Sequence, residues 1–339
     1  MANQYNIGIV GASGLVGRRI VPNLATSKIE IETLRLLATS KSVGRKFKFR
    51  EQSIRLEELT ETSFEGLDIA LFSAGSHVSE HFVPIAVNSG CVVIDNGSYW
   101  RLDENVPLVV PEVNPDSLHH HKGIIANPNC STIILAVPLA PIVRKYKVAN
   151  VIVSTYQAIS GGGQTLLNKF RKQMYPKDGF AQTPEFKDDK HRLIDSIVFH
   201  SDYNQFGRTI EEEKMVNEIH KIISPDINII PTCVRIPVTV GHCESVTIQL
   251  AEHCHIDDVR QLLANAPGVI LTDDTTDNYP SPQMCRGKFD IFVGRVRVER
   301  VNDADVISMW IAGDNLHKGA AANAIQIAEY LIDNSLLKF

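Results

Sequence analysis

Short apolar runs alternate with stretches of helical spacing over the first 126 residues of the chain. The five runs, at residues 6–10, 34–38, 68–72, 91–94 and 123–126, are apolar almost throughout. Runs of this length are typical of strands that are buried on both faces of a parallel sheet. Strands that alternate with helices pack as a doubly wound α/β domain, whose ligands lie at the carboxyl ends of the strands. We therefore expect a parallel sheet with a ligand site at that edge.

The pattern changes after residue 130, where apolar and polar residues alternate. Residues 151–154 predict a strand, and alternation at 234–238, 245–250, 289–298 and 305–312 predicts four more, the last two as a hairpin around Asn302-Asp303. Such strands, with helical stretches such as 210–223 between them, predict an antiparallel sheet with helices on one face. The alanine-rich segment 319–337 predicts a closing helix that returns to the first domain. The polar stretch 169–202 has no clear assignment.

Length and composition favour a two-domain globular protein. A chain of 339 residues is too long for one ordinary core, and 44% hydrophobic with 22% charged residues is an ordinary balance. We expect an N-terminal Rossmann-type dinucleotide-binding domain at 1–130 plus 315–339, and an α+β domain with a mostly antiparallel sheet at 131–314. The net charge of -5 argues against a nucleic-acid partner. Without an apolar stretch of membrane length or a signal-peptide pattern, we expect no membrane association and a cytoplasmic location.

A glycine-rich loop, Gly11-Ala12-Ser13-Gly14-Leu15-Val16-Gly17, follows the first apolar run and precedes a helical stretch. Glycines at this spacing let the backbone turn tightly and approach a pyrophosphate, which rests on the helix N-terminus. The second strand is followed by Thr39-Ser40-Lys41-Ser42, where an NAD enzyme usually has an acid for the ribose 2′-hydroxyl. Hydroxyls and a cation suit a 2′-phosphate, so NADP is favoured over NAD. The alternative interpretation of this stretch is a solvated turn.

Cys130 stands between the short strand at 123–126 and the apolar run at 133–137, which predicts a buried helix. Backbone N–H groups and the helix dipole favour a thiolate at that position, although many cysteines are only inert buried residues. The six cysteines form no C-x-x-C pair, which favours reduced thiols over a disulfide framework. His119-His120-His121 and His253-Cys254-His255 lack zinc-site spacing, so no metal is expected.

Five pieces in order resemble the aspartate-semialdehyde dehydrogenase family over nearly the whole chain. They are the glycine loop, Asn127-Pro128-Asn129-Cys130-Ser131-Thr132, Thr155-Tyr156-Gln157, Arg235 with His242, and Asp314-Asn315-Leu316-His317-Lys318-Gly319-Ala320-Ala321. Gly97 and Gly162 are minor departures, because the family often has a hydroxyl residue and a small alanine there. The resemblance implies NADPH-dependent reductive dephosphorylation of L-aspartyl 4-phosphate to L-aspartate 4-semialdehyde, in the pathway to lysine, methionine and threonine.

The resemblance also implies residue roles in the second, catalytic and dimerisation domain and at its border. Cys130 would be the nucleophile that forms a thioester, His242 the acid–base group, and Gln157 the residue that orients the acyl intermediate. An imidazole near its ordinary pKa can both give and accept a proton, so we expect His242 to titrate in the neutral range. The substrate-binding residues would be Arg101, Asn129 and Lys214 for the phosphate, Glu211 for the α-ammonium and Arg235 for the α-carboxylate.

We expect the cofactor to contact the glycine loop, the end of the second strand, two further strand ends and part of the second domain. These residues are Gly11, Ser13, Gly14, Leu15, Val16, Thr39, Ser40, Lys41, Ser42, Ser73, Gly75, Ser160, Gly161 and Asn315. The resemblance further implies a homodimer, possibly a tetramer.

Four other functions stay open from the residues alone, one of which is a more distant dehydrogenase of the glyceraldehyde-phosphate type. A related acyl-phosphate reductase of the N-acetyl-γ-glutamyl-phosphate type has a substrate with no ammonium group, which leaves Glu211 without a purpose. A catalytically silent nucleotide-binding paralogue is opposed by the joint presence of Cys130, Gln157, Arg235 and His242. A cysteine hydrolase would leave the glycine loop unexplained.

Overall fold

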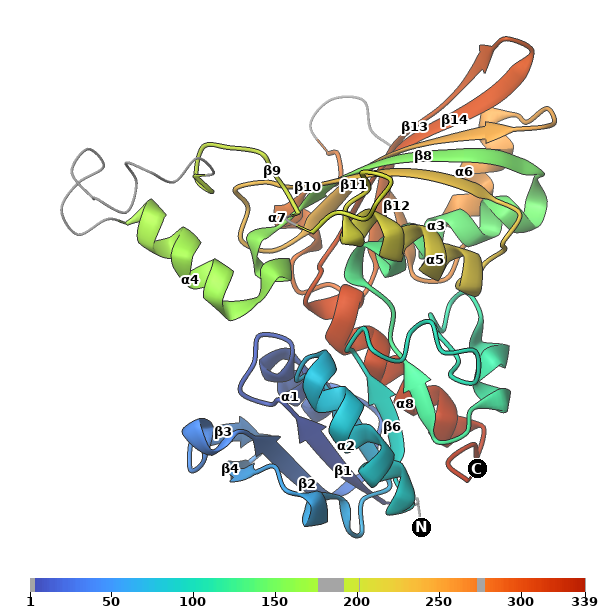
Figure 1. Ribbon diagram of the computed structural model, residues 1–339. Helices are drawn as coiled ribbons and strands as arrows, with labels where there is room; N and C mark the ends of the chain where they lie inside the picture. Colours follow the sequence, from blue (N-terminus) through green and yellow to red (C-terminus); the bar gives the residue numbers. More distant parts are fainter. Residues whose placement is uncertain (1–3, 176–191, 201, 273–277, 339) are drawn as a thin grey trace. The chain divides into compact units, whose positions relative to one another are not determined.

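The computed structural model describes residues 4–175, 192–200, 202–272 and 278–338, and its chain forms two compact units (Figure 1). Unit 1 comprises Met1–Ala136, Glu218–Ser224 and His317–Phe339, and unit 2 comprises Val137–Asn217 and Pro225–Leu316. The domain boundaries expected from the sequence, 1–130 with 315–339 and 131–314, stay a prediction. Part of the unassigned stretch 169–202 lies outside the described residues.

Unit 1 is built on a sheet whose strands have the order β3-β4-β2-β1-β5-β6-β7 over the described residues. The pairs β4–β2, β2–β1, β1–β5, β5–β6 and β6–β7 are parallel, as expected for a doubly wound α/β domain. The strands are β1 (Tyr5–Val10), β2 (Ile31–Ala38), β3 (Lys46–Phe49), β4 (Gln52–Glu58), β5 (Ile69–Phe72), β6 (Val92–Asp95) and β7 (Ile124–Ala126).

Helices cover both faces of this sheet, because successive strand residues point to opposite sides. Ile9 of β1 packs in one cluster with Leu24 of α1 (Gly17–Thr26) and Leu331 of α8 (Asn323–Asp333). Val10, the next residue of β1, packs in a second cluster with Val83 of α2 (Ser76–Asn88). The C-terminal helix therefore returns to the first sheet, as its apolar face predicts.

The hairpin of β3 and β4 at the sheet edge was not expected from the sequence. Its strands pair antiparallel, and the lysines at 46 and 48 project outward from β3 while Phe49 is buried. Charged side chains on an edge strand discourage pairing with another chain. The same charges weaken the apolar signal by which a buried strand is recognised.

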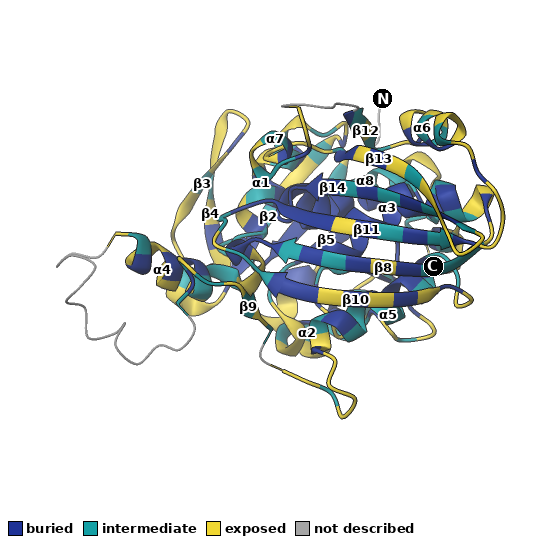
Figure 2. Cartoon of the chain, turned by 90° about the horizontal axis from the view of Figure 1, so that it is seen from above, coloured by how far each residue is buried: buried dark blue, intermediate teal, exposed yellow. Residues whose placement is uncertain are grey.

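Unit 2 is built on a sheet whose described strands have the order β12-β13-β14-β11-β8-β10-β9. The pairs β12–β13 and β8–β10 are parallel, and the other four are antiparallel, so the expected mostly antiparallel α+β arrangement is confirmed. The strands are β8 (Val148–Gln157), β9 (Val198–Phe199), β10 (Asn228–Arg235), β11 (His242–Leu250), β12 (Val269–Thr272), β13 (Ile291–Val301) and β14 (Ala304–Gly313). Figure 2 shows these strands side by side, with exposed residues recurring along several of them.

The remaining helices are α3 (Cys130–Lys145), α4 (Gly163–Met174), α5 (Ile210–Ile222), α6 (Ile256–Ala264) and α7 (Pro282–Cys285). The short helical turns are η1 (Ser40–Ser42), η2 (Glu61–Phe64), η3 (Pro115–His120), η4 (Ile159–Gly162) and the π-helix His317–Ala322. No helix in the described ranges has the length and apolar character needed to cross a membrane.

The structure confirms one expected hairpin and corrects the bounds of one expected strand and one expected helix. The hairpin at Asn302-Asp303 is confirmed, and the positive φ angles of both residues, 48° and 64°, are those of a type I′ turn. The expected strand 234–238 is wrong in its second half, since β10 ends at Arg235 and Pro237 has no N–H to donate to a ladder. The closing helix begins at Asn323 and not at 319, because the π-helix precedes it.

Candidate active site

The glycine loop connects β1 to α1 at the carboxyl edge of the unit 1 sheet. Gly11 has a φ of 82°, and a Cβ added there would collide with the backbone oxygen of Ser73, which follows β5. A Cβ at Gly17 would collide with the backbone oxygen of Gly11. Side chains are excluded at both positions, so only glycine allows the tight turn by which a loop of this kind brings its backbone and the helix N-terminus to a pyrophosphate. Gly75, with a φ of 86°, precedes α2 at the same edge.

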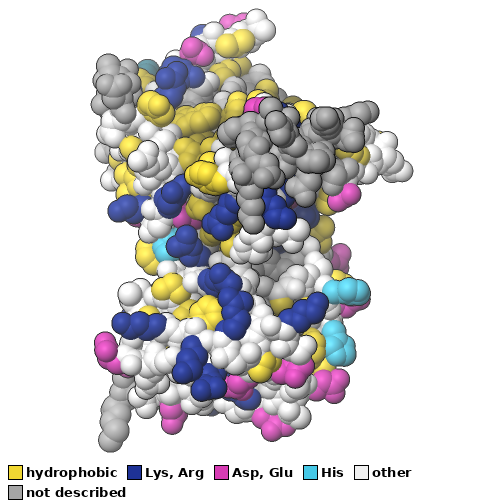
Figure 3. All heavy atoms as spheres, turned by 90° about the vertical axis from the view of Figure 1, so that its left-hand side faces the viewer, with side chains coloured by type: hydrophobic (Ala, Val, Ile, Leu, Met, Phe, Trp, Pro, Cys, Tyr) yellow, Lys and Arg dark blue, Asp and Glu magenta, His cyan; other side chains and the backbone are white. Residues whose placement is uncertain are grey.

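Lys41 lies in η1, the turn that follows β2, and its side chain is exposed. Residues 39–50 contain five cations, at 41, 45, 46, 48 and 50, and no acidic residue. Lys and Arg side chains gather on the face of unit 1 that carries β3 and β4, in the lower half of Figure 3. This charge balance suits a phosphate group better than a bare ribose hydroxyl.

Cys130 is the first residue of α3, directly after the turn that follows β7. The side-chain oxygen of Asn129 accepts hydrogen bonds from the backbone N–H groups of Ser131 and Thr132, at 2.9 and 3.5 Å, and so caps the helix. Cys130 is half-buried, whereas the other five cysteines are buried. The expected position of Cys130, between a strand and a buried helix, is confirmed.

Burial sets the other five thiols apart chemically. It raises the pKa of Cys91, Cys233, Cys243 and Cys254, and it raises that of Cys285 to about 12. These side chains stay protonated and inert at neutral pH. Cys130 is therefore the accessible candidate for a nucleophile.

Arg101 is held beside this segment within unit 1. Its Nη1 donates to Oε1 of Glu218 at 2.9 Å, and its Nη2 donates to the backbone oxygen of Asn96 at 2.8 Å. Oε2 of the same Glu218 accepts from the backbone N–H of Asn129 at 2.6 Å. Two sequence-predicted residues, Arg101 and Asn129, are thus joined by a carboxylate that was not predicted. The signal was present, since Glu218 follows Glu211 and Lys214 at helical spacing.

In unit 2, Gln157, Arg235 and His242 come together at the ends of three adjacent strands. Arg235 at the end of β10 pairs with Gln157 at the end of β8, and β11 begins at His242. Nη1 of Arg235 donates to the backbone oxygen of Ala158 at 2.8 Å, while Nδ1 of His242 accepts from the Ala158 N–H at 2.9 Å. A Cβ at Gly161 would lie 3.0 Å from Nη1 of Arg235 and 3.3 Å from Nε2 of His242. A larger residue at 161 would therefore have to displace the Arg235 or His242 side chain by a few tenths of an ångström.

Glu211 and Lys214 complete this set from the first turns of α5. Nε2 of Gln157 donates to Oε1 of Glu211 at 3.2 Å, and Nζ of Lys214 lies 3.6 Å from Oε2 of Glu211. Arg235, Glu211 and Lys214 supply one anion and two cations around Gln157. That set of charges matches a ligand that carries an ammonium group and more than one anionic group.

The expectation that His242 is an imidazole of ordinary pKa is wrong. Its side chain is completely buried, and burial together with the nearby charge of Arg235 lowers its pKa to about 3, although Glu211 opposes the shift. Because the Ala158 N–H can only donate, Nδ1 of His242 must accept. The ring is therefore neutral and carries its proton on Nε2.

Ser160 and Asn315 lie together in unit 2. Nδ2 of Asn315 donates to Oγ of Ser160 at 3.0 Å, and Oδ1 of Asn315 accepts from the backbone N–H of Gly241 at 2.9 Å. Both residues are thereby held next to the start of β11. Their predicted contact with the cofactor stays a prediction.

The predicted site residues are divided between the two units. The glycine loop, Lys41, Arg101, Asn129 and Cys130 belong to unit 1, and Gln157, Glu211, Lys214, Arg235 and His242 belong to unit 2. Each half is assembled by contacts of its own.

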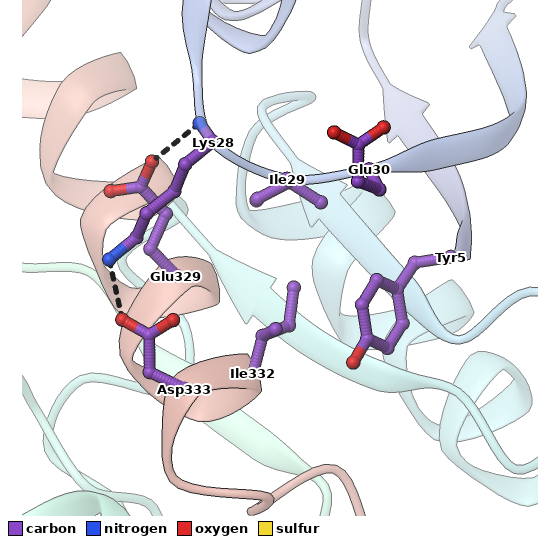
Figure 4. Close-up of a pocket in the computed structure, with 7 residues that line it drawn as sticks. All are labelled: Tyr5, Lys28, Ile29, Glu30, Glu329, Ile332 and Asp333. Carbon is purple, nitrogen blue, oxygen red and sulfur yellow. Dashed lines mark hydrogen bonds and ion pairs between the residues drawn. The ribbon is translucent and has the colours of Figure 1, made fainter. Parts of the chain in front are cut away.

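A separate pocket of about 220 Å³ lies in unit 1 and contains none of these residues (Figure 4). Its lining is Tyr5, Lys28, Ile29, Glu30, Glu329, Ile332 and Asp333, and Lys28 is paired with Asp333. Tyr5 begins β1 whereas the glycine loop follows its end, so the pocket lies at the opposite edge of the sheet. No group of three His, Cys, Asp or Glu side chains within the described residues could hold a metal ion.

Two family models cover most of the chain. Residues 6–121 match the NAD binding domain of semialdehyde dehydrogenase, and residues 139–318 match its dimerisation domain. A dinucleotide-binding sheet followed by this second domain defines an oxidoreductase of the semialdehyde dehydrogenase class.

Full-length relatives narrow the class. Aspartate-semialdehyde dehydrogenase of Bacillus subtilis (strain 168) is 44% identical, and that of Aquifex aeolicus (strain VF5) is 42% identical, each covering 98% of this chain and 98–99% of the relative. The crystal structure of aspartate semialdehyde dehydrogenase II from Vibrio cholerae, complexed with ASA, is 36% identical with a TM-score of 0.91, covering 98% of this chain and 99% of that one. The chain belongs to the aspartate-semialdehyde dehydrogenase family, which confirms the resemblance found in the sequence.

Proposed function

We propose that this enzyme catalyses the NADPH-dependent reductive dephosphorylation of L-aspartyl 4-phosphate to L-aspartate 4-semialdehyde. The names of the full-length relatives and the ASA complex of the Vibrio cholerae enzyme support this substrate. One structural observation carries the proposal. The half-buried thiol of Cys130 begins a helix in unit 1, and unit 2 gathers Arg235, Glu211 and Lys214 around Gln157.

The chemistry begins with the thiol. The Cys130 thiolate attacks the acyl carbon of the substrate, the carbon–oxygen bond to phosphate breaks, and phosphate leaves with the bonding electrons. A thioester remains, which is a good acceptor of hydride. When bound, the dinucleotide supplies that hydride, and the glycine loop fits such a ligand because glycine at 11 and 17 allows the tight turn that leads into the N-terminus of α1. Loss of the Cys130 thiolate from the tetrahedral intermediate then yields the aldehyde.

His242 acts in this sequence as a hydrogen-bond donor. Its Nδ1 accepts from the Ala158 N–H, and in the proposed reaction its Nε2–H donates to the oxyanion that develops on the acyl carbon. A neutral imidazole in a completely buried site needs no reorganisation to donate in this way. The low pKa of His242 argues against a protonated, positively charged imidazole before the reaction begins.

The charged side chains recognise the substrate. Arg235 binds the α-carboxylate, Glu211 binds the α-ammonium, and Arg101, Asn129 and Lys214 bind the phosphate. The guanidinium of Arg235 is already oriented by its bond to the Ala158 oxygen, and its planar fork matches a carboxylate. Glu211 is oriented by Gln157, which in turn orients the acyl group.

The preferred cofactor is NADP, and the enzyme works in the cytoplasm as a homodimer, with a tetramer as the next possibility. The acid-free segment 39–50 supports NADP. A dimer is supported by the match to a dimerisation domain and by Ile152 of β8 and Ile230 of β10. These two residues are register partners and are exposed by 49% and 44%. Burying them between two copies would remove apolar surface from water.

The test is phosphate-dependent reduction of NADP by L-aspartate 4-semialdehyde, followed by the absorbance of NADPH. N-acetyl-L-glutamate 5-semialdehyde serves as the control substrate, because it lacks the ammonium group that Glu211 would bind. We expect reduction with the first substrate only, and only in the presence of phosphate. Equal use of the control substrate, or no reduction with either, would overturn the proposal.

A further inference from the structure

Glu218 occupies a position that the proposed reaction does not yet use. It lies on the last turn of α5 within unit 1, and only 1% of the residue is exposed. One carboxylate oxygen accepts from Nη1 of Arg101, and the other accepts from the backbone N–H of Asn129. A single buried carboxylate therefore connects a phosphate-binding candidate with the residue that precedes the nucleophile.

The Arg101 side of this bridge is held from several directions. Its Nη2 donates to the Asn96 oxygen, and Nζ of Lys221 donates to the backbone oxygens of Arg101, Asp103 and Val106 at 2.7–2.9 Å. The Nε–H of Arg101 is buried and has no partner among the described residues. A buried donor without an acceptor is costly, so this edge of the guanidinium is suited to an incoming anion.

The Asn129 side is held equally firmly. The backbone N–H of Asn129 donates to the Glu218 carboxylate, and the Asn129 side chain caps α3. Two residues earlier, Oδ1 of Asn127 accepts from Nδ2 of Asn323 at 2.7 Å, and its Nδ2 donates to Oδ1 of Asn96 at 3.0 Å. The backbone that leads into Cys130 thus has little freedom. Glu218 relates it to Arg101 through a carboxylate, and Asn96 is a second link, since it accepts from both Arg101 and Asn127.

We propose that Glu218 is a positioning residue, whose carboxylate holds the Arg101 guanidinium in place beside the start of α3 so that Arg101 can bind the phosphate of the substrate. The inference rests on the proposed function, because it takes Arg101 as a phosphate ligand. A carboxylate near a phosphate site opposes phosphate binding by charge alone. Its presence there is explained by geometry, since a fixed guanidinium needs no reorganisation when phosphate arrives.

If Glu218 acts only by its charge, Glu218→Gln should strengthen phosphate binding, whereas if it positions Arg101 the substitution should weaken phosphate binding. The amide keeps the shape but offers one acceptor where the carboxylate offers two, so either Arg101 or the Asn129 N–H loses its partner. If Glu218 positions Arg101, the KM for inorganic phosphate in the semialdehyde-to-NADPH direction rises roughly tenfold or more. The KM values for NADP and semialdehyde stay unchanged. A KM for phosphate that falls or is unaltered in the variant would overturn the inference.

Two further variants complete the design. Glu213→Gln removes the same charge from the same helix, five residues earlier, and is expected to leave the KM for phosphate unaltered. Glu218→Asp keeps the charge but shortens the reach, so its KM for phosphate should lie between those of the wild type and the Gln variant. This variant also carries the test if the Gln variant fails to fold, and the same KM as the wild type would then overturn the inference.

A double-mutant comparison shows whether Glu218 acts through Arg101. In an Arg101→Lys background, Glu218→Gln should add little to the rise in KM for phosphate, because the group that it positions is already altered. Additive effects of the two substitutions would overturn the inference. Failure of the proposed function itself is recognised separately, because the wild-type enzyme would then show no phosphate-dependent reduction of NADP.

Discussion

Glu244 on β11 is a completely buried carboxyl group, and its replacement by Gln should stabilise the enzyme at neutral pH. It lies opposite Thr155 of β8 and Ile311 of β14. Neither of its carboxyl oxygens has a hydrogen-bond partner among the described residues. Burial alone raises its pKa well above the ordinary carboxyl value of 4.5. The group is therefore neutral in the folded protein over a range where it ionises in the unfolded chain.

The sign of the pH dependence follows from the proton balance. Above the ordinary carboxyl pKa the unfolded chain releases a proton that the folded protein keeps, so the free energy of unfolding falls as pH rises. The loss is about 1.4 kcal/mol for each pH unit until the folded pKa is reached. Two pH units in that range amount to about 3 kcal/mol, a large share of the stability of an ordinary domain, which is about 5–15 kcal/mol. Gln has nearly the same shape and does not titrate.

The assay is urea unfolding of the wild type and of Glu244→Gln across a pH range that extends from below the ordinary aspartate pKa of 3.8 to neutral pH. The two proteins should be nearly equal in stability at the acidic end, and the variant should gain an advantage as pH rises. Asp305→Asn is the control of opposite sign, because the backbone N–H of Cys254 and then the His253 side chain lower the Asp305 pKa. Its deficit should shrink as pH falls below the ordinary value of 3.8. A stability difference for the Glu244 variant that does not change with pH would refute the reasoning.

Four further predictions concern the proposed active site. Cys130→Ser should keep the fold and abolish turnover, because a serine hydroxyl is not ionised at neutral pH, and a thiol reagent should label Cys130 before the five buried cysteines. Lys41→Asp should raise the KM for NADP much more than the KM for NAD. Arg235→Lys keeps the charge but loses the fork, so kcat/KM for the semialdehyde should fall by about tenfold to a hundredfold at unchanged KM for NADP. His242→Asn should lower kcat by about 10²–10⁴-fold, and the wild-type rate should show no ionisation near the ordinary histidine pKa.

Each of these expectations has a contrary outcome. Full activity after selective labelling of Cys130 would remove it as the nucleophile. Equal effects of Lys41→Asp on both cofactors would separate Lys41 from the 2′-phosphate. An unchanged kcat/KM in Arg235→Lys would place the carboxylate elsewhere, and a histidine ionisation that disappears in His242→Asn would show that the imidazole titrates during turnover.

The candidate site was recognisable in the sequence as far as its motifs are local. The glycine loop and the segment at Cys130 are each one continuous stretch of sequence. Each includes a strand end, a turn and a helix start, whose conformations depend on neighbouring residues. The glycine-to-helix spacing and the apolar run after Cys130 are therefore sufficient to place both at strand ends. The roles assigned to individual residues stay predictions.

The protonation of His242 shows what such reasoning misses. Its pKa depends on complete burial and on the charge of Arg235. Which ring nitrogen carries the proton depends on an N–H from Ala158, which is 84 residues away in the chain. No local pattern carries that information. The β3–β4 hairpin was missed for a related reason, because its exposed lysines resemble a solvated loop.

By itself the sequence determined the family, the Rossmann-type sheet, the mostly antiparallel second sheet and the position of Cys130 at a helix start. These features depend on periodicity and on short motifs, which act over a few residues. Only the tertiary structure decided which groups meet, such as Glu218 and Arg101, which are 117 residues apart in the chain. It also decided that the carboxyl of Glu244 is buried without a hydrogen-bond partner among the described residues. Hydrogen-bond partners and burial are properties of the packed chain, and they set protonation and orientation within the site.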